Sequence, residues 1–144
     1  MQYLRFQFLG KQAERMKAAK TGLRRWVPAI LLMAVIFIAS SIPGNDMPGF
    51  GGWDAILKKG AHMTGYALLA MCYLYALANS RKLNPLILSV AIILAGLYAA
   101  TDEFHQSFTP GRSPSLADVG IDALGAVIGA AIWAKILMPR RTRL

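Results

Sequence analysis

The sequence predicts an all-α integral membrane protein, a four-helix bundle with both termini in the cytoplasm. Three observations support this prediction. The 144 residues are 56% hydrophobic and only 16% charged, which is too apolar for most soluble domains of this size. Four apolar stretches come close to the length that a helix needs to cross a bilayer. The basic residues are also distributed unevenly among the connections, as in oriented membrane proteins.

The overall composition excludes several classes of protein. The formal net charge of +9 comes from 16 Lys and Arg against 7 Asp and Glu. Disorder is not expected, because a disordered chain combines high charge with low hydrophobicity. We expect no nucleic-acid partner, because a basic soluble module needs surface on which to display its charge. The single cysteine, Cys72, excludes a disulfide framework and any multi-cysteine metal site, and we expect no resident metal or cofactor.

The predicted spans are defined by their apolar runs and by the residues that interrupt them. They cover residues 26–42, 61–78, 85–101 and 116–138. The first span carries no charge and ends at Pro43-Gly44. The third begins with Pro85, and proline is favoured in the first turn of a helix. No span shows the alternation of a barrel strand, so the membrane domain is expected to be helical.

The positions of the charges predict the orientation. Thirteen of the 16 basic residues precede the first span, separate the second from the third, or lie at the C-terminal end. With both termini inside, the formal charge is +12 on the cytoplasmic side and −3 outside, as the positive-inside rule expects. The predicted organisation is a basic cytoplasmic segment (1–25), a four-span membrane domain (26–138) and a basic cytoplasmic tail (139–144).

The N-terminal segment has a competing interpretation as a signal peptide, because a basic region leads into an apolar run. A leader of 25 residues and an apolar run of 17 are long for that purpose. A retained leader either lies on the anionic inner leaflet, through aromatic residues among its basic ones, or forms a disordered tail. The later spans keep the same orientation in both cases.

Polar residues that a bilayer tolerates poorly collect on the predicted outer side, in three segments. The first segment begins the second span, where Lys59, His62 and Tyr66 have the spacing of one helical face. A histidine in this position can exchange protons, bind a metal or hydrogen-bond across the bundle. The sequence leaves these three uses open, although the hydrogen bond is the commonest one.

The second segment leaves the third span and is dense in ionisable groups. At helical spacing Asp102 reaches His105 or Gln106, and Glu103 reaches Gln106. A carboxylate near Arg112 would stay charged, whereas one buried with another carboxylate would be suited to acid–base chemistry. The alternative is a solvated outer loop whose charges pair with one another.

The third segment begins the fourth span. Ser115 and Asp118 match a helix-capping pattern, but Asp122 lies a turn deeper and has no such role. Asp118, Asp122, Gly125 and Gly129 share one helical face. The two glycines allow another helix to approach closely, within the bundle or across a dimer. Packing within the chain is favoured, because Asp122 on the same face should avoid lipid.

This pattern of residues resembles the signature of the VanZ-like membrane protein family. The family's longer motif typically reads DE-x-x-Q-x-F-x-P-x-R-x-x-S-x-x-D-x-x-x-D-x-x-G, and here it runs from Asp102 to Gly125. Its first motif, usually K-x-x-H-F-x-x-Y, resembles the stretch from Lys59 to Tyr66. The resemblance covers residues 54–130, which form the motif core of the membrane domain.

Two departures from the first motif affect what can be carried over. Met63 stands where phenylalanine is usual, and Gly65 stands where many members carry glutamate before the tyrosine. The resemblance therefore implies no role for a carboxylate at that second position. The resemblance implies a multi-pass protein of the bacterial cytoplasmic membrane with a place in the cell envelope. The founding member is associated with low-level teicoplanin resistance, but the resemblance implies no particular activity.

Two hypotheses about function remain open. In the first, the polar residues form a catalytic or ligand site facing the envelope, in which Arg112 and Lys59 hold an anionic headgroup, a phosphate or a lipid-linked precursor. Asp102 or Glu103 would act as acid or base with His62 as proton partner. The candidate catalytic residues are Glu103, Asp102, His62 and Asp122. The candidate substrate-binding residues are Lys59, Tyr66, His105, Gln106, Arg112, Ser115 and Asp118.

In the second hypothesis the protein is a non-catalytic accessory of the membrane. Its charged cluster is then a structural ion-pair network or a surface for a partner, and removing one member would strongly destabilise the fold. Transport has little support from four spans without evident repeats. A metal site has little support as well, because the cluster of acids and histidines has no established ligand spacing.

Overall fold

The structure is a computed structural model that describes residues 7, 21–49, 51–78 and 84–137. Its elements are α2 (Val27–Ser40), the short 3-10 turns η1 (Gly44–Asp46) and η2 (Gly51–Trp53), α3 (Asp54–Ala78), α4 (Pro85–Gln106), α5 (Leu116–Ile132) and η3 (Trp133–Leu137), which is π-helical. The described part of the chain contains no strand. The predicted all-α class is therefore confirmed.

Four helices are long and apolar enough to cross a membrane, which confirms a multi-pass membrane protein. They are Thr21–Ser40, Gly51–Ala78, Pro85–Gln106 and Leu116–Ile136. Their orientation relative to the two sides of the membrane remains a prediction. Most of the basic leader, the Arg81-Lys82 connection and the tail 139–144 lie outside the described residues.

Two of the helices are longer than the apolar runs that predicted them. α3 begins at Asp54 rather than at residue 61, and α4 continues through Gln106 rather than ending at residue 101. The predicted ends fell where polar residues begin. α4 continues beyond its predicted end because the polar side chains of Asp102 and Glu103 turn inward and are buried. Polarity therefore marked a face of the helix and did not mark its end.

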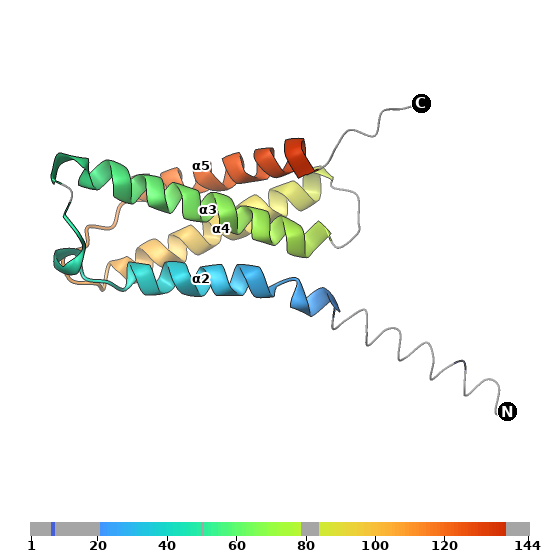
Figure 1. Cartoon of the computed structure of the whole chain (residues 1–144), viewed down its shortest axis with the longest axis horizontal. Coiled ribbons are helices and arrows are strands. Elements are labelled where there is room, and N and C mark those ends of the chain that lie inside the picture. Colours follow the sequence, from blue (N-terminus) through green and yellow to red (C-terminus); the bar gives the residue numbers. More distant parts are fainter. Residues whose placement is uncertain (1–6, 8–20, 50, 79–83, 138–144) are drawn as a thin grey trace.

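The helices run alternately up and down the bundle (Figure 1). As a result, the ends of α2 and α4 and the starts of α3 and α5 lie together at one end. α3 is the central helix and packs most extensively against α5, while α2 makes the fewest contacts with the others. One end of the bundle therefore gathers residues from all four helices.

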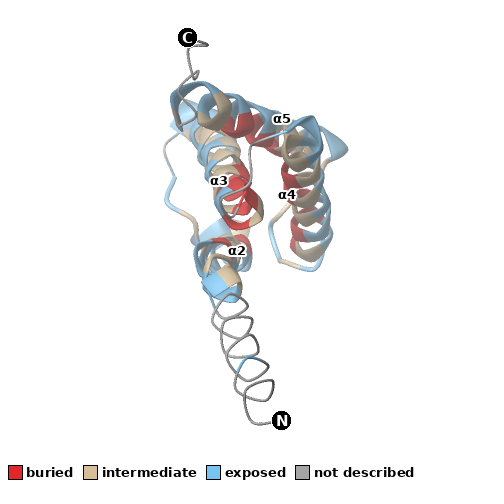
Figure 2. Cartoon of the chain, turned by 90° about the vertical axis from the view of Figure 1, so that its right-hand side faces the viewer, coloured by how far each residue is buried: buried red, intermediate tan, exposed pale blue. Residues whose placement is uncertain are grey.

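Small side chains dominate the core, and the buried residues face inward between the helices (Figure 2). The larger members of the core are Tyr66, Leu69, Tyr73 and Leu74. Alanines fill most of the rest, at Ala29, Ala70, Ala91, Ala95, Ala99, Ala126 and Ala130. Many large apolar side chains face outward instead. Such an arrangement suits a lipid solvent, in which close packing of small residues brings helices together.

The glycine face of α5 packs against α3 within the chain. A Cβ atom at Gly125 would overlap the backbone of Met63, and one at Gly129 would overlap the backbone of Ala67. Only glycine therefore allows the two helix backbones to approach this closely. The interface explains why Asp122, on the same face of α5, points into the bundle and is 1% exposed.

Candidate functional site

The polar segments that the sequence singled out meet around a pocket of about 390 Å³ at the gathered end of the bundle. α3 and α5 contribute residues from their first turns, and α4 contributes residues from its last turn. The loop after α2 and the loop before α5 complete the wall. The charged and amide side chains of the lining are Asp54, Lys58, Lys59, His62, Glu103, Gln106, Arg112, Asp118 and Asp122.

The helix that carries Asp118 and Asp122 starts at a side-chain cap. Ser115 is the N-cap of α5, and its hydroxyl accepts a hydrogen bond from the backbone N–H of Ala117 at 3.1 Å. The predicted cap is thus confirmed for Ser115. Asp118 instead accepts a hydrogen bond from the Lys59 ammonium at 2.5 Å, in an ion pair whose two side chains are both partly exposed to solvent. Exposed pairs of this kind stabilise a fold only slightly.

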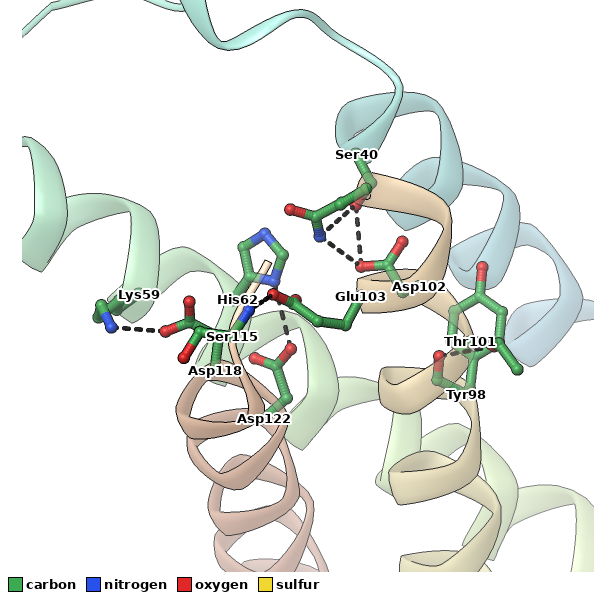
Figure 3. Close-up of polar contacts among 11 residues, drawn as sticks. Ser40, Lys59, His62, Tyr98, Thr101, Asp102, Glu103, Ser115, Asp118 and Asp122 are labelled. Atoms are coloured by element: carbon green, nitrogen blue, oxygen red, sulfur yellow. Dashed lines mark hydrogen bonds and ion pairs between the residues drawn. The ribbon is translucent and has the colours of Figure 1, made fainter. Parts of the chain in front are cut away.

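Deeper in the pocket, His62 pairs with Asp122 across α3 and α5 (Figure 3). The Nδ1 atom of the imidazole lies 3.3 Å from Oδ2 of the aspartate. The sequence suggested Asp102 or Glu103 as the proton partner of His62, but the histidine hydrogen-bonds Asp122 instead. The second ring nitrogen points away from Asp122 in Figure 3, and His62 lines the pocket. An imidazole oriented by a carboxylate in this way is suited to proton transfer.

Glu103 projects from the last turn of α4 and is 8% exposed. Its Oε1 atom accepts a hydrogen bond from the backbone N–H of Ser115 at 2.5 Å (Figure 3). This bond connects the end of α4 to the start of α5. Glu103 also lines the pocket, so its carboxyl group lies between the helix connection and the space in which a ligand would bind.

Asp102 belongs to a separate, closed network on the side of α2 (Figure 3). Its Oδ2 atom accepts from the Ser40 hydroxyl at 2.9 Å and from the Gln106 amide at 3.1 Å, and that amide also lies 3.4 Å from the Ser40 hydroxyl. All three side chains are buried. The Asp102–Gln106 contact confirms the helical spacing expected from the sequence. Ser40 was missed, because a single serine at the end of an apolar span carries no motif.

We expect Ser40→Ala to destabilise the protein by about 1–3 kcal/mol, because Asp102 would lose a buried hydrogen-bond donor. Ser107→Ala is the matched control, since that exposed hydroxyl, at the C-cap of α4, donates to the carbonyl of Phe104 in the last turn. We expect the control to change stability by less than about 0.5 kcal/mol. Thermal unfolding of the detergent-solubilised variants tests this, and equal losses would contradict the network.

Like Asp102 and Ser115, the candidate residues His105 and Tyr66 lie outside the pocket lining. The ring of His105 stacks on Phe37 with 4.2 Å between centroids, and its Nε2 atom lies 3.0 Å from the Ser41 hydroxyl. His105 thus connects α4 to α2. Tyr66 is completely buried below the pocket, with its ring 6.4 Å from that of His62. Its hydroxyl has no hydrogen-bond partner among the described residues.

Arg112 lines the pocket and also closes the end of α2. Its Nε and Nη2 atoms donate to the carbonyls of Ile42 and Ala39, at 3.2 and 3.1 Å. Nearby, the backbone N–H of Gly44 donates to the carbonyl oxygen of Pro110 at 2.9 Å. No sequence pattern indicated that the loop after α2 forms part of the site, because this loop lacks a motif of its own.

Gly111, beside Arg112, explains how the two loops approach each other. Its φ of +72° lies in the left-handed region that glycine adopts readily. A Cβ atom at Gly44 would overlap the backbone of Gly111, so both positions require glycine for the loops to touch.

Among the described residues, no group of three or more His, Cys, Asp or Glu side chains could hold a metal ion.

These features define a multi-pass helical membrane protein with a polar pocket at one end of its bundle. The chain belongs to the VanZ-like family, since the family model described as VanZ/LLP1 matches residues 25–138 and so includes all of α2 to α5. No curated protein and no solved structure matches the chain.

Proposed function

We propose that this protein binds the anionic headgroup of an envelope lipid or lipid-linked precursor in its pocket. The supporting observation is the pair of cations, Lys58 and Arg112, in a pocket at the end of a membrane bundle. Lys59 is already paired with Asp118. Lys58 has no ion-pair partner among the described residues, and the backbone contacts of Arg112 leave its Nη1 group for a ligand.

The proposal includes a location, which is the bacterial cytoplasmic membrane with both termini inside. Under the positive-inside rule, the sequence charges favour this orientation. The pocket then opens at the outer face, where headgroups and lipid-linked precursors are found. An effect on glycopeptide susceptibility would follow if the bound headgroup belongs to a precursor that such drugs recognise.

Proton transfer to or from the bound headgroup is the catalytic form of the same proposal. His62, oriented by Asp122, would be the proton-transferring group, and Glu103 would be a second acid or base. Asp102, in contrast, hydrogen-bonds on the α2 side through its Oδ2 atom and lies outside the lining. We therefore propose a structural role for Asp102 and assign the roles in proton transfer to His62, Asp122 and Glu103.

We expect Lys58→Gln to weaken the binding of phosphatidic acid, used as the anionic probe, by about tenfold. Hydrogen bonds to charged groups contribute about 1.5–3 kcal/mol, and each 1.4 kcal/mol is tenfold in affinity. Lys135→Gln is the matched control, because that exposed lysine lies in η3, at the opposite end of the bundle. Titration of purified protein followed by native mass spectrometry measures both affinities. Equal affinities for the two variants would refute the proposed site.

A non-catalytic accessory role is the second candidate function. It is favoured by the buried network of Ser40, Asp102 and Gln106, which connects α2 to α4 and of which only Gln106 reaches the pocket lining. In that case the charged cluster holds the helices together or contacts a partner protein. The same titration separates the two candidates, because an accessory protein would show no saturable binding of phosphatidic acid in the wild type.

A further inference from the structure

Glu103 is the acidic group of the pocket whose charge is not matched by the protein. It is 8% exposed, and the hydrogen bond that the described residues give it is the one from the Ser115 amide. The described residues contain no ion pair to it. Its other charged neighbours are Asp118, Asp122 and His62. Of these only His62 can carry a positive charge, and it is hydrogen-bonded to Asp122.

The remaining charges of the lining are paired with one another or engaged elsewhere. Asp118 is paired with Lys59, and Asp122 with His62. Asp54, the last acid of the lining, also has an interaction partner. The charged groups of the lining that remain without an ion-pair partner among the described residues are therefore the cations Lys58 and Arg112 and the acid Glu103.

A buried carboxylate without a cation is costly in a protein interior, and still more so in a bundle surrounded by lipid. One backbone N–H offsets only part of that cost. A ligand that brought a positive charge to Glu103 would remove this energetic cost. A phosphate group on the same ligand would then contact Lys58 and Arg112. A purely anionic headgroup would use the two cations and leave Glu103 facing another negative charge.

We infer that Glu103 receives a primary ammonium group, and that the ligand is zwitterionic, with a phosphate and a primary amine a short linker apart, as in phosphoethanolamine. The inference rests on the proposed function and specifies its ligand class. A carboxylate accepts hydrogen bonds, so it recognises an amine that carries N–H donors better than a quaternary ammonium that has none. The pocket, at about 390 Å³, has the volume of a small-molecule site.

The test compares three lipids on the detergent-solubilised full chain by native mass spectrometry. Phosphatidylethanolamine carries the phosphate and the primary amine, phosphatidylcholine replaces the amine by a quaternary group, and phosphatidic acid lacks the amine. We expect the wild type to bind phosphatidylethanolamine about tenfold more tightly than phosphatidylcholine, which is the value of one good charge-assisted hydrogen bond. Glu103→Gln should abolish this preference while affinity for phosphatidic acid stays the same or rises.

Asp46→Asn is the matched control, because that exposed acid lies in η1 and is not part of the lining. It should keep the preference. A wild type that does not distinguish phosphatidylethanolamine from phosphatidylcholine overturns the inference, and so does a Glu103→Gln protein that keeps the preference. The wild-type comparison decides the question even if the Glu103→Gln variant fails to fold.

The failure of the proposed function gives a different result, in which the wild type binds none of the three lipids. Soluble phosphoethanolamine separates two sources of the same chemistry. If this compound displaces phosphatidylethanolamine from the protein, the inference is supported and the free headgroup is sufficient as a ligand. A preference for phosphatidylethanolamine without such competition supports the inference with the intact lipid as the ligand.

Discussion

Gly129→Ala should destabilise the bundle by about 1–3 kcal/mol, the usual cost of overpacking a closely packed interior. The direction is opposite to helix propensity, since alanine is the better helix former. The reason is the position of Gly129 on α5, where an added Cβ would overlap the backbone of Ala67 on α3. A backbone carbonyl cannot rotate aside as a side chain can. The two helices would have to separate along the largest interface of the bundle.

Gly120→Ala is the matched control on the same helix. Gly120 is exposed, and nothing lies within 4 Å of a Cβ added there. We expect this variant to be as stable as the wild type, or more stable by about 0.5–1 kcal/mol, because alanine restricts the unfolded chain. Equilibrium unfolding of both variants in mixed micelles measures the difference. The interface would be refuted if the two substitutions had effects of the same sign and size.

His62→Ala should be destabilising by about 3–5 kcal/mol, the range seen when one partner of a buried charged pair is removed. The loss of the imidazole leaves the Asp122 carboxylate, which is 1% exposed, without its partner. Adding Asp122→Asn in the same chain should recover much of that loss, because the buried charge is then absent. We therefore expect the double variant to be more stable than His62→Ala alone.

His105→Ala provides the control for this prediction. His105 has a stacked phenylalanine and a serine as partners, so its removal leaves no buried carboxylate behind. Asp122→Asn should give no recovery in the His105→Ala background. A double-mutant cycle on the four stabilities separates the pairing from the packing of the ring. If Asp122→Asn fails to rescue His62→Ala, the pair does not contribute as the geometry implies.

The fold could be predicted from the sequence because a bilayer imposes length and composition on each span. The ends of the helices were less predictable for the same reason. The run from Asp102 to Gln106 is polar enough to indicate a loop, yet it is the last turn of α4. Apolar length alone does not distinguish a helix that ends from one whose polar face turns inward.

The site could be predicted as a set of residues, but its pairings could not. Helical spacing placed Lys59 and His62 on one face, and Asp118 and Asp122 on another. Which acid meets which base depends on the rotation and depth of α3 relative to α5, and the glycine interface sets these. His105 and Gln106 are adjacent in sequence but lie about 100° apart on the helix. His105 therefore contacts Ser41, whereas Gln106 contacts Ser40 and Asp102 in the buried network.

The contact of Arg112 with α2 also bears on the order in which the protein is made. The carbonyls of Ala39 and Ile42 are completed by a side chain that lies 73 and 70 residues further along the chain. During translation, α2 enters the membrane long before Arg112 leaves the ribosome. The first helix of the bundle thus acquires its final end only when synthesis reaches the last connection. A nascent chain without that connection lacks both arginine donors, so the Ala39 carbonyl keeps only backbone donors such as the N–H of Ile42 and the Ile42 carbonyl loses its arginine partner.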